Sequence, residues 1–269
     1  MIIDNLPIRE YHNAAPKYLS KTSIRDFAEH GPAWWNMSYL TRTLPKERPD
    51  GALQGLALDC YLTEGADAFT SQWCVKPVDM SFATKEGKEW KAAHAGKEIL
   101  TAVDFAILGD AVAAVRALPC WREIERSKAQ QTLRRESQGL GLGIQSRPDW
   151  LDTNTGCLWD LKKTRDLSRF GSQAIDLGYH LQAAIAGWVM AGDSVGLEHA
   201  YLVAVEWERG ARARCYEIPH EVLQAGDKEM RSTAAEIADR LKRNDWTDVQ
   251  PEPQALEIPD WMLRKMEAV

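Results

Sequence analysis

The chain has 269 residues, 45% of them hydrophobic, and a formal net charge of −6 at pH 7. This length and hydrophobic content predict a single globular domain with a substantial core. The negative net charge does not by itself suggest a protein that binds nucleic acid. No stretch approaches the roughly 20 apolar residues of a membrane span, and the N-terminus lacks the apolar region of a signal peptide, so we expect a cytoplasmic protein with no membrane partner.

The first 130 residues are predicted to be mainly helical. Residues 1–20 show no strong period and are expected to lie on the surface. Ser20 is a candidate N-cap, and Ile24 and Phe27 follow it at helical spacing until the Gly31-Pro32 pair ends the helix. An apolar segment then restarts the helical pattern.

Further helices are predicted before residue 130. A charged loop that contains proline occupies residues 45–50, and residues 51–62 form a helix whose small residues allow close backbone approach. A strand is expected within residues 70–79, and a charged helix begins at Thr84. Another helix begins near Thr101, because an acidic residue follows at the spacing of a capping box. Its apolar face comprises Val103, Ile107, Ala111, Val115 and Leu118, and Pro119 ends it.

Residues 131–220 are predicted to hold the sheet and the functional core. A strand pattern occupies residues 132–137, and a glycine-rich turn follows it. A polar segment at residues 165–171 precedes a long helix predicted over residues 171–191, and an apolar central strand is expected at 200–207. The predicted inward face of the long helix comprises Ile175, Tyr179, Gln182, Ala183, Ala186 and Val189. The remaining elements are predicted as a strand at 212–218, an amphipathic helix at 221–243 and a tail at 251–269 suited to packing or a subunit contact.

The central feature is a predicted β-hairpin over residues 147–164. Two strand-length apolar runs flank a turn at residues 153–156, whose Asn and Gly tolerate positive φ. This loop places Asp149 directly opposite Asp160. Directly opposed residues have Cβ atoms roughly 4.5–5.5 Å apart, and two carboxylates at that distance repel unless a cation lies between them. The pair therefore predicts a divalent metal site.

A lysine completes this site. Side chains alternate along a strand, so Lys162 lies on the same face as Asp160, while Trp159 and Leu161 point into a core. Two acids and an amine are thus expected to converge. An ordinary hairpin with solvent-facing acids is the alternative.

The pattern of Pro148-Asp149 followed by Asp160-Leu161-Lys162 across a hairpin resembles the PD-(D/E)XK nuclease superfamily. Three ordered blocks, at residues 147–151, 160–166 and 179–184, are similar to its RecE-type branch, the relatives of phage and prophage recombination exonucleases. The resemblance implies an α/β fold in which a mixed central β-sheet is flanked by helices, with a restriction-endonuclease-like core and extra N-terminal helices. We expect one nuclease domain over residues 1–269, with a C-terminal helix and tail after residue 220.

The resemblance also assigns roles. It implies Asp149, Asp160, Lys162, Tyr179 and Gln182 as catalytic residues, with Tyr179 and Gln182 orienting the lysine, the water or a phosphate. The implied cofactor is Mg²⁺, for which Mn²⁺ can substitute. Metal ligands would be Asp149, Asp160, the Leu161 backbone carbonyl and Asp59, with Glu136 as a minor candidate. Some nucleases with this core hold an iron–sulfur cluster through four cysteines, but the five cysteines here are scattered and none is expected.

Asp59 departs from the family pattern. RecE-type nucleases usually carry a histidine at this position of the glycine-rich helix. A carboxylate suits magnesium or manganese at least as well as imidazole does, so Asp59 is predicted to replace the histidine as ligand. The alternative is that Asp59 caps or solvates the helix and the site has lost a ligand.

The basic residues must act locally because the chain is acidic overall. A cluster around the predicted site forms the expected DNA-binding surface. Lys85 and Lys88 on a separate helix are further candidates, but a solvated helix face is the more common explanation of such a cluster. The expected DNA-binding residues are Arg147, Lys163, Thr164, Arg165 and Arg169.

The resemblance implies a 5′–3′ exonuclease that resects double-stranded DNA ends to 3′ single strands for recombination by single-strand annealing. The implied partners are DNA ends, a RecT-like annealing protein and further copies of the chain in a ring. The alternatives are an endonuclease or structure-specific nuclease of the same superfamily, and a catalytically silent DNA-binding subunit.

Overall fold

The structure is a computed structural model, and it describes residues 1–45, 51–192, 196–248, 255 and 257–267. The strands are β1 (Ile2–Ile3), β2 (Tyr18–Leu19), β3 (Trp73–Lys76), β4 (Glu98–Thr101), β5 (Lys128–Ala129), β6 (Thr132–Ser137), β7 (Leu142–Ser146), β8 (Trp150–Asp152), β9 (Cys157–Thr164), β10 (His199–Glu206) and β11 (Ala213–Glu217). The α-helices are α1 (Ile8–His12), α2 (Lys21–Trp35), α3 (Ala52–Asp59), α4 (Ala66–Gln72), α5 (Lys85–Ala93), α6 (Ala102–Arg116), α7 (Trp121–Arg126), α8 (Phe170–Asp176), α9 (Tyr179–Met190), α10 (His220–Arg243) and α11 (Asp260–Glu267). Three shorter helical turns are the π-helical η1 (Asn36–Leu40) and η2 (Cys60–Glu64) and the 3₁₀-helical η3 (Leu167–Arg169).

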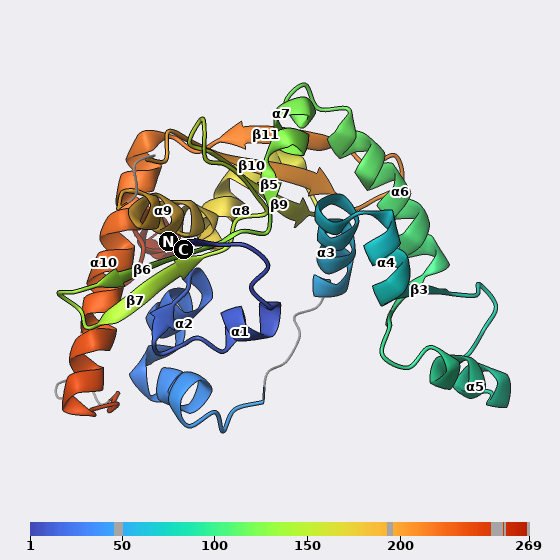
Figure 1. Cartoon of the computed structure of the whole chain (residues 1–269). Helices are drawn as coiled ribbons and strands as arrows, with labels where there is room; N and C mark the ends of the chain where they lie inside the picture. Colours follow the sequence, from blue (N-terminus) through green and yellow to red (C-terminus); the bar gives the residue numbers. More distant parts are fainter. Residues whose placement is uncertain (46–50, 193–195, 249–254, 256, 268–269) are drawn as a thin grey trace.

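The central sheet has five strands in the order β11-β10-β9-β8-β5. β9 and β10 are parallel, and α8 and α9 form the crossover between them, whereas the other pairs are antiparallel. β10 therefore lies inside the sheet, as its apolar sequence predicts. In Figure 1 the helices α8 and α9 lie on one side of β9, and α3, α4 and α6 lie on the other.

A second, four-stranded sheet has the order β1-β6-β7-β2. Three residues separate the end of β7 at Ser146 from the start of β8 at Trp150, so the chain passes directly from one sheet into the other. The expectation that residues 1–20 only follow the surface is wrong, because β1 pairs with β6 and β2 pairs with β7. Strands of two residues are too short to show an alternating pattern in the sequence.

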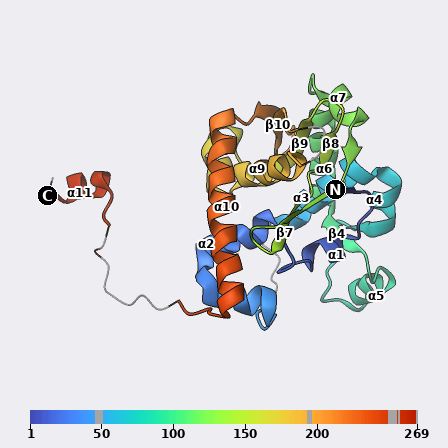
Figure 2. The same cartoon turned by 60° about the vertical axis from the view of Figure 1, so that its left-hand side comes forward.

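Two hydrophobic cores lie on opposite faces of the central sheet. Leu158 packs into a core shared with α2, α9 and α10, while its neighbours Trp159 and Leu161 pack into a core shared with α3, α6 and α7. This alternation confirms the prediction that Trp159 and Leu161 point away from the metal site. Figure 2 shows α10 lying along α9 and α2 on the first face.

Two predicted helix faces need correction. The helix predicted over residues 171–191 is broken at Gly178, which has φ +63° and separates α8 from α9. Ile175 was predicted on the inward face of this helix, but its side chain is 50% exposed. Val103, predicted on the apolar face of α6, is 63% exposed. The predicted N-cap Ser20 and the predicted helix starts at Thr84 and Thr101 are confirmed, since the side chain of each accepts a backbone hydrogen bond at the start of its helix.

Three further expectations concern a helix end, a loop and tail, and membrane spans. Gly31, with φ +78°, interrupts α2 at the predicted helix end before Pro32. Residues 46–50 of the predicted loop and most of the tail before α11 lie outside the described residues. Within the described residues, no helix combines the length and the apolar character needed to cross a membrane.

Candidate active site

The hairpin of β8 and β9 has the predicted register. Trp150 pairs with Trp159 and Asp152 with Cys157, which leaves residues 153–156 as the loop. Asp152 shapes this turn by accepting hydrogen bonds from the Asn154 amide at 2.9 Å and the Thr155 hydroxyl at 2.8 Å. Continuing the register by one residue brings Asp149 beside Asp160, which confirms the predicted juxtaposition.

Asp149 lies just before β8, at the point where the two strands stop pairing. Its Oδ2 accepts a hydrogen bond of 2.6 Å from the backbone N–H of Leu161. The N–H and C=O of one strand residue point toward the same edge, so the Leu161 carbonyl also faces Asp149. Its role as a metal ligand stays a prediction.

Asp160 is held by two residues, Gln182 on α9 and Lys162 on β9. It is 1% exposed, and its Oδ1 accepts a hydrogen bond of 2.8 Å from the Gln182 amide on α9. Its Oδ2 forms an ion pair with Lys162 and accepts no hydrogen bond from the rest of the described chain. Gln182 also donates to the Arg147 carbonyl at 3.4 Å, which ties α9 to the loop before β8.

The break at Gly178 positions Tyr179 at the start of α9. The Lys162 ammonium lies 5.0 Å from the centroid of the Tyr179 ring, within the range of a cation–π contact. Tyr179 and Gln182 are one helical turn apart and both reach the Asp160–Lys162 pair, as predicted. The two residues therefore hold the lysine and the acid from the same helix.

Asp59 reaches the site from the opposite side of the hairpin. It is the last residue of α3, where the helix widens into the π-helical turn η2. The side-chain amide of Gln130 donates to Asp59 Oδ1 at 3.0 Å and Oδ2 at 3.3 Å, and to Asp149 Oδ1 at 3.4 Å. One amide group therefore bridges the two carboxylates. The prediction that Asp59 belongs to this site, and is not only a helix cap, agrees with this contact.

Gln130 was not identified from the sequence. It has φ +54°, a conformation that non-glycine residues adopt rarely and that is often found at functional sites. Its side-chain oxygen accepts a hydrogen bond of 2.9 Å from Arg147 Nε. The only signal in the sequence was an amide residue two positions before the strand predicted at residues 132–137.

The carboxylates repel one another in this arrangement. Burial, followed by the nearby Asp160 and opposed by Lys162, raises the pKa of Asp59 to about 6. Burial, with Asp160 and Asp59 beside it, raises the pKa of Asp149 well above its ordinary value. A cation would relieve this cost.

The donor set fits a hard divalent cation. Asp59, Asp149, Asp160 and the Leu161 carbonyl offer oxygen ligands only, which is the set that magnesium and manganese prefer. In this structure the Gln130 amide donates hydrogen bonds to Asp59 and Asp149, and the Lys162 ammonium pairs with Asp160. Among the described residues, three ligand atoms of His, Cys, Asp or Glu side chains lie within 4.8 Å of one another only at Asp26, Glu29 and His30 on α2, so the carboxylates of Asp59, Asp149 and Asp160 are spaced more widely than that. Asp26 already accepts a hydrogen bond from Tyr39 at 2.6 Å.

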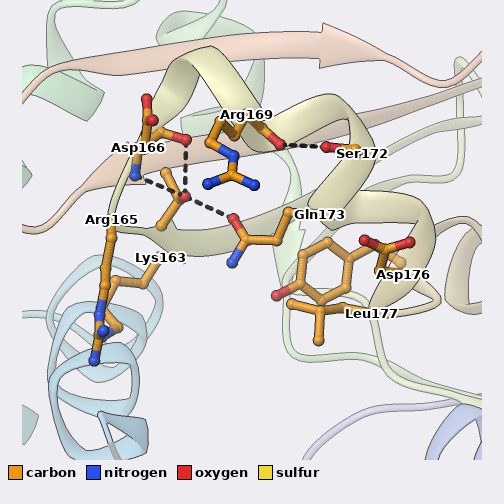
Figure 3. Close-up of a pocket in the computed structure, with 10 residues that line it drawn as sticks. Lys163, Arg165, Asp166, Arg169, Ser172, Gln173, Asp176 and Leu177 are labelled. Carbon is orange, nitrogen blue, oxygen red and sulfur yellow. Dashed lines mark hydrogen bonds between the residues drawn. The ribbon is translucent and has the colours of Figure 1, made fainter. Parts of the chain in front are cut away.

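A cavity of about 640 Å³ adjoins the site, and Tyr179 forms part of its wall. Three basic residues, Lys163, Arg165 and Arg169, and two acidic ones, Asp166 and Asp176, line it, so this cavity is basic on balance. Four of the predicted DNA-binding residues line it together, namely Lys163, Thr164, Arg165 and Arg169. Figure 3 shows Arg169 and Gln173 on one wall, with Lys163 and Arg165 extending from the end of β9. Burial, and then Arg165, lowers the pKa of Lys163, so an anion in the cavity would be favoured.

Arg147, unlike these four residues, does not line the cavity. Its guanidinium donates to Gln130 and, at 2.7 Å, to the Leu6 carbonyl. Arg147 thus supports the residue that bridges Asp59 and Asp149. A direct contact between Arg147 and DNA stays a prediction.

Three other candidates are not brought to the site. Glu136 is exposed on β6, where it accepts a hydrogen bond from Tyr18 and lines a different cavity. Lys85 and Lys88 lie on α5, which both views show apart from β9. Their predicted contact with DNA is not tested by this arrangement.

Comparison with known proteins identifies the fold. The family model described as "PDDEXK-like domain of unknown function (DUF3799)" matches residues 20–252. A crystal structure from Eubacterium rectale, described as that of a candidate exonuclease, is similar with a TM-score of 0.67 and 13% identity, over 99% of this chain and 100% of that chain. A phage-related exonuclease from Haemophilus somnus is similar with a TM-score of 0.37 and 15% identity, over 87% of this chain and 99% of that one. No curated protein matches the chain.

Proposed function

Because the chain belongs to the PDDEXK-like family DUF3799, whose model matches residues 20–252, we propose that it is a metal-dependent deoxyribonuclease. The observation that carries the proposal is the convergence of Asp149, Asp160 and Lys162 in one buried site beside a basic cavity. Asp-x-Lys alone occurs by chance in many proteins. Its placement across a hairpin from a second acid is what distinguishes a nuclease site.

The proposed metal site contains Asp59, Asp149, Asp160 and the Leu161 carbonyl, and it would hold one or two Mg²⁺ ions. A bound divalent ion supplies a nucleophilic water at neutral pH and stabilises the charge that develops on the phosphate. The protein must therefore keep these oxygens together. Gln182 does so for Asp160, and Gln130 does so for Asp59 and Asp149.

Lys162 acts in this proposal as a positively charged group. Burial alone would lower the pKa of Lys162, but the carboxylates of Asp160 and Asp149 outweigh it and raise the pKa above its ordinary value. An ammonium group that stays protonated at neutral pH is a poor general base. Lys162 is instead suited to orient the phosphate and to offset its charge.

The basic cavity supports a path for the DNA strand. Lys163, Arg165 and Arg169 provide positive charge next to the site although the chain is acidic overall. Such local charge positions the phosphate backbone without reading its sequence.

We further propose that the substrate is a double-stranded DNA end, digested 5′ to 3′ to leave a 3′ single strand for a RecT-like annealing partner, with the chain acting as a ring-shaped oligomer. The similarity of residues 147–151, 160–166 and 179–184 to RecE-type exonucleases supports this substrate. An endonuclease with the same core is the alternative in the same chemical class.

The test uses two DNA forms of equal sequence. Linear duplex labelled at either the 5′ or the 3′ end, and the same DNA as a covalently closed circle, are incubated with Mg²⁺, Mn²⁺ or a chelator. The proposal expects progressive loss of the linear form, with the 5′ label released first and the circle intact. Cutting of the closed circle at a comparable rate would support the endonuclease, and early release of the 3′ label would reverse the polarity.

A further inference from the structure

A second lysine lies beside the active site. Lys21 is the first residue of α2, directly after the N-cap Ser20. The N-cap is reciprocal, because the Ser23 amide donates to Ser20 Oγ at 3.4 Å and the Ser20 amide donates to Ser23 Oγ at 2.8 Å. This pair of hydrogen bonds fixes the backbone from which the Lys21 side chain extends.

The Lys21 side chain reaches the wall of the active site. Its ammonium lies 5.5 Å from the centroid of the Tyr179 ring, and the Lys162 ammonium lies 5.0 Å from the same centroid. Two ammonium groups from separate parts of the chain therefore share one aromatic ring. Tyr179 also lines the basic cavity, so Lys21 stands where the site and the cavity meet.

Among the residues that the structure describes, Lys21 differs from its charged neighbours in having no anionic partner. Lys162 is paired with Asp160, and Arg25 is paired with Glu29 and donates to the Leu177 carbonyl at 3.0 Å. Throughout the described residues, the Lys21 ammonium has neither a carboxylate within 4.0 Å nor a hydrogen-bond acceptor. Burying a cation without a partner costs free energy, so the position favours an anion that the protein itself does not supply.

The electrostatics of the surroundings agree with this reading. Lys21 is half-buried, and burial, then Lys162 and Arg25, lower its pKa to about 8. Asp160 acts in the opposite direction, but its charge is already offset by Lys162. An anion placed between the two lysines would offset both positive charges.

We propose that Lys21 binds a backbone phosphate of the DNA strand that is cut, together with Lys162 and above the Tyr179 ring. This inference rests on the proposed function, because it takes the scissile strand to enter at Asp160. Lys21 is then a substrate-binding residue. The catalytic motif contains no counterpart of it.

The experiment pairs a protein change with a phosphate change. The variants are Lys21→Met, which keeps the aliphatic chain, Lys21→Arg, which keeps the charge, and Lys228→Met on the exposed face of α10 as a matched control. The DNA is a short duplex in which one phosphate at a time, at the scissile position or beside it, is a neutral methylphosphonate. Binding is measured by fluorescence anisotropy at several salt concentrations, with Ca²⁺ replacing Mg²⁺ and over times in which the duplex stays intact.

We expect Lys21→Met to weaken binding about tenfold and to lower the slope of log K against log salt by about 0.9, the contribution of one phosphate contact. Lys21→Arg should restore most of the affinity, and Lys228→Met should bind like the parent. A methylphosphonate at the contacted position should weaken the parent but have no further effect on Lys21→Met. If Lys21→Met binds like the parent, or if every methylphosphonate weakens both proteins equally, the inference is wrong.

The failure of this inference can be told apart from the failure of the proposed function. If the parent does not cut linear duplex with Mg²⁺ or Mn²⁺, or if Asp160→Ala cuts as well as the parent, the proposed function itself is wrong. If the parent cuts through Asp160 while Lys21→Met is unchanged in binding and rate, only the role of Lys21 is wrong. Thermal melting of each variant verifies folding, and Lys21→Gln, which also removes the charge, serves as the test if Lys21→Met does not fold.

Discussion

Replacing Asp59 by Asn should stabilise the metal-free protein at neutral pH. Asp59 is ionised there although it lies among other acids and is largely buried. Asparagine keeps the size of the side chain and an oxygen that can accept from Gln130, but it removes the charge. The substitution therefore isolates the electrostatic cost of keeping a third carboxylate in this site.

The size of the gain follows from the pKa. The pKa of Asp59 rises from 3.8 to about 6, mainly through burial and then through Asp160. A pKa difference of one corresponds to about 1.36 kcal/mol, so ionised Asp59 costs the folded state at most about 3 kcal/mol. For a chain of this size, about 2 °C per kcal/mol gives a rise in Tm of about 2–6 °C.

The sign of the pH dependence is fixed by the direction of the shift. The folded protein holds a proton on Asp59 up to about pH 6, whereas the unfolded chain releases it near 3.8. Below 3.8 the residue is neutral in both states, and the cost is absent. The stabilisation of Asp59→Asn should thus be complete above about pH 6 and should disappear as the pH falls toward 3.8.

The assay is thermal melting of the parent and Asp59→Asn at pH 8 and pH 4, with a chelator and with Mg²⁺. Magnesium should raise the Tm of the parent, because a ligand that binds only the folded state stabilises it, and it should raise the Tm of Asp59→Asn less. Asp79→Asn, at an exposed position between β3 and α5, is the control. If Asp59→Asn melts at or below the Tm of the parent in chelator at pH 8, Asp59 is not the strained acid described above. If Mg²⁺ stabilises both proteins equally, Asp59 is not a ligand.

Three further outcomes are expected. Gln130→Ala removes the amide that bridges Asp59 and Asp149, so the metal-free protein should lose about 1–3 kcal/mol of unfolding free energy in urea melts; no loss would mean that the bridge is incidental. Gly178→Ala places a side chain at φ +63°, so the free energy of unfolding should fall by about 1–2 kcal/mol. The rate of DNA cutting should also fall because Tyr179 shifts, and an unchanged melting curve and rate would refute this. Arg165→Ala should lower the salt slope of DNA binding by about 0.9 without changing sequence preference, whereas an unchanged slope would place DNA elsewhere.

The hairpin could be predicted from the sequence because its turn residues and its two apolar runs fix one register. That register alone brings Asp149 to Asp160 and puts Lys162 on the same face. Tyr179 and Gln182 were identified through the family resemblance and their spacing on one helix. The hairpin prediction succeeded because a short-range pattern determines the positions of these side chains.

The parts that the sequence did not predict depend on contacts between distant segments. The apolar period runs through Gly178, so the break that places Tyr179 at a helix start was not apparent. Gln130 has a left-handed backbone conformation that no local sequence pattern predicts. Its side chain donates hydrogen bonds to Asp59 and Asp149, which are 71 and 19 positions away in the sequence. Lys21 has the sequence context of an ordinary helix start, and only the packing of α2 beside α9 shows what it faces.

The initial rate of digestion of end-labelled linear duplex tests the central claim most directly. It should be measured with Mg²⁺ for the parent, Asp160→Ala and Lys162→Ala, each first shown by circular dichroism to be folded. We predict that the parent digests the duplex, that the chelator stops it, and that each variant loses at least about a hundredfold in rate. A folded variant that digests DNA as fast as the parent would contradict the assignment of this site.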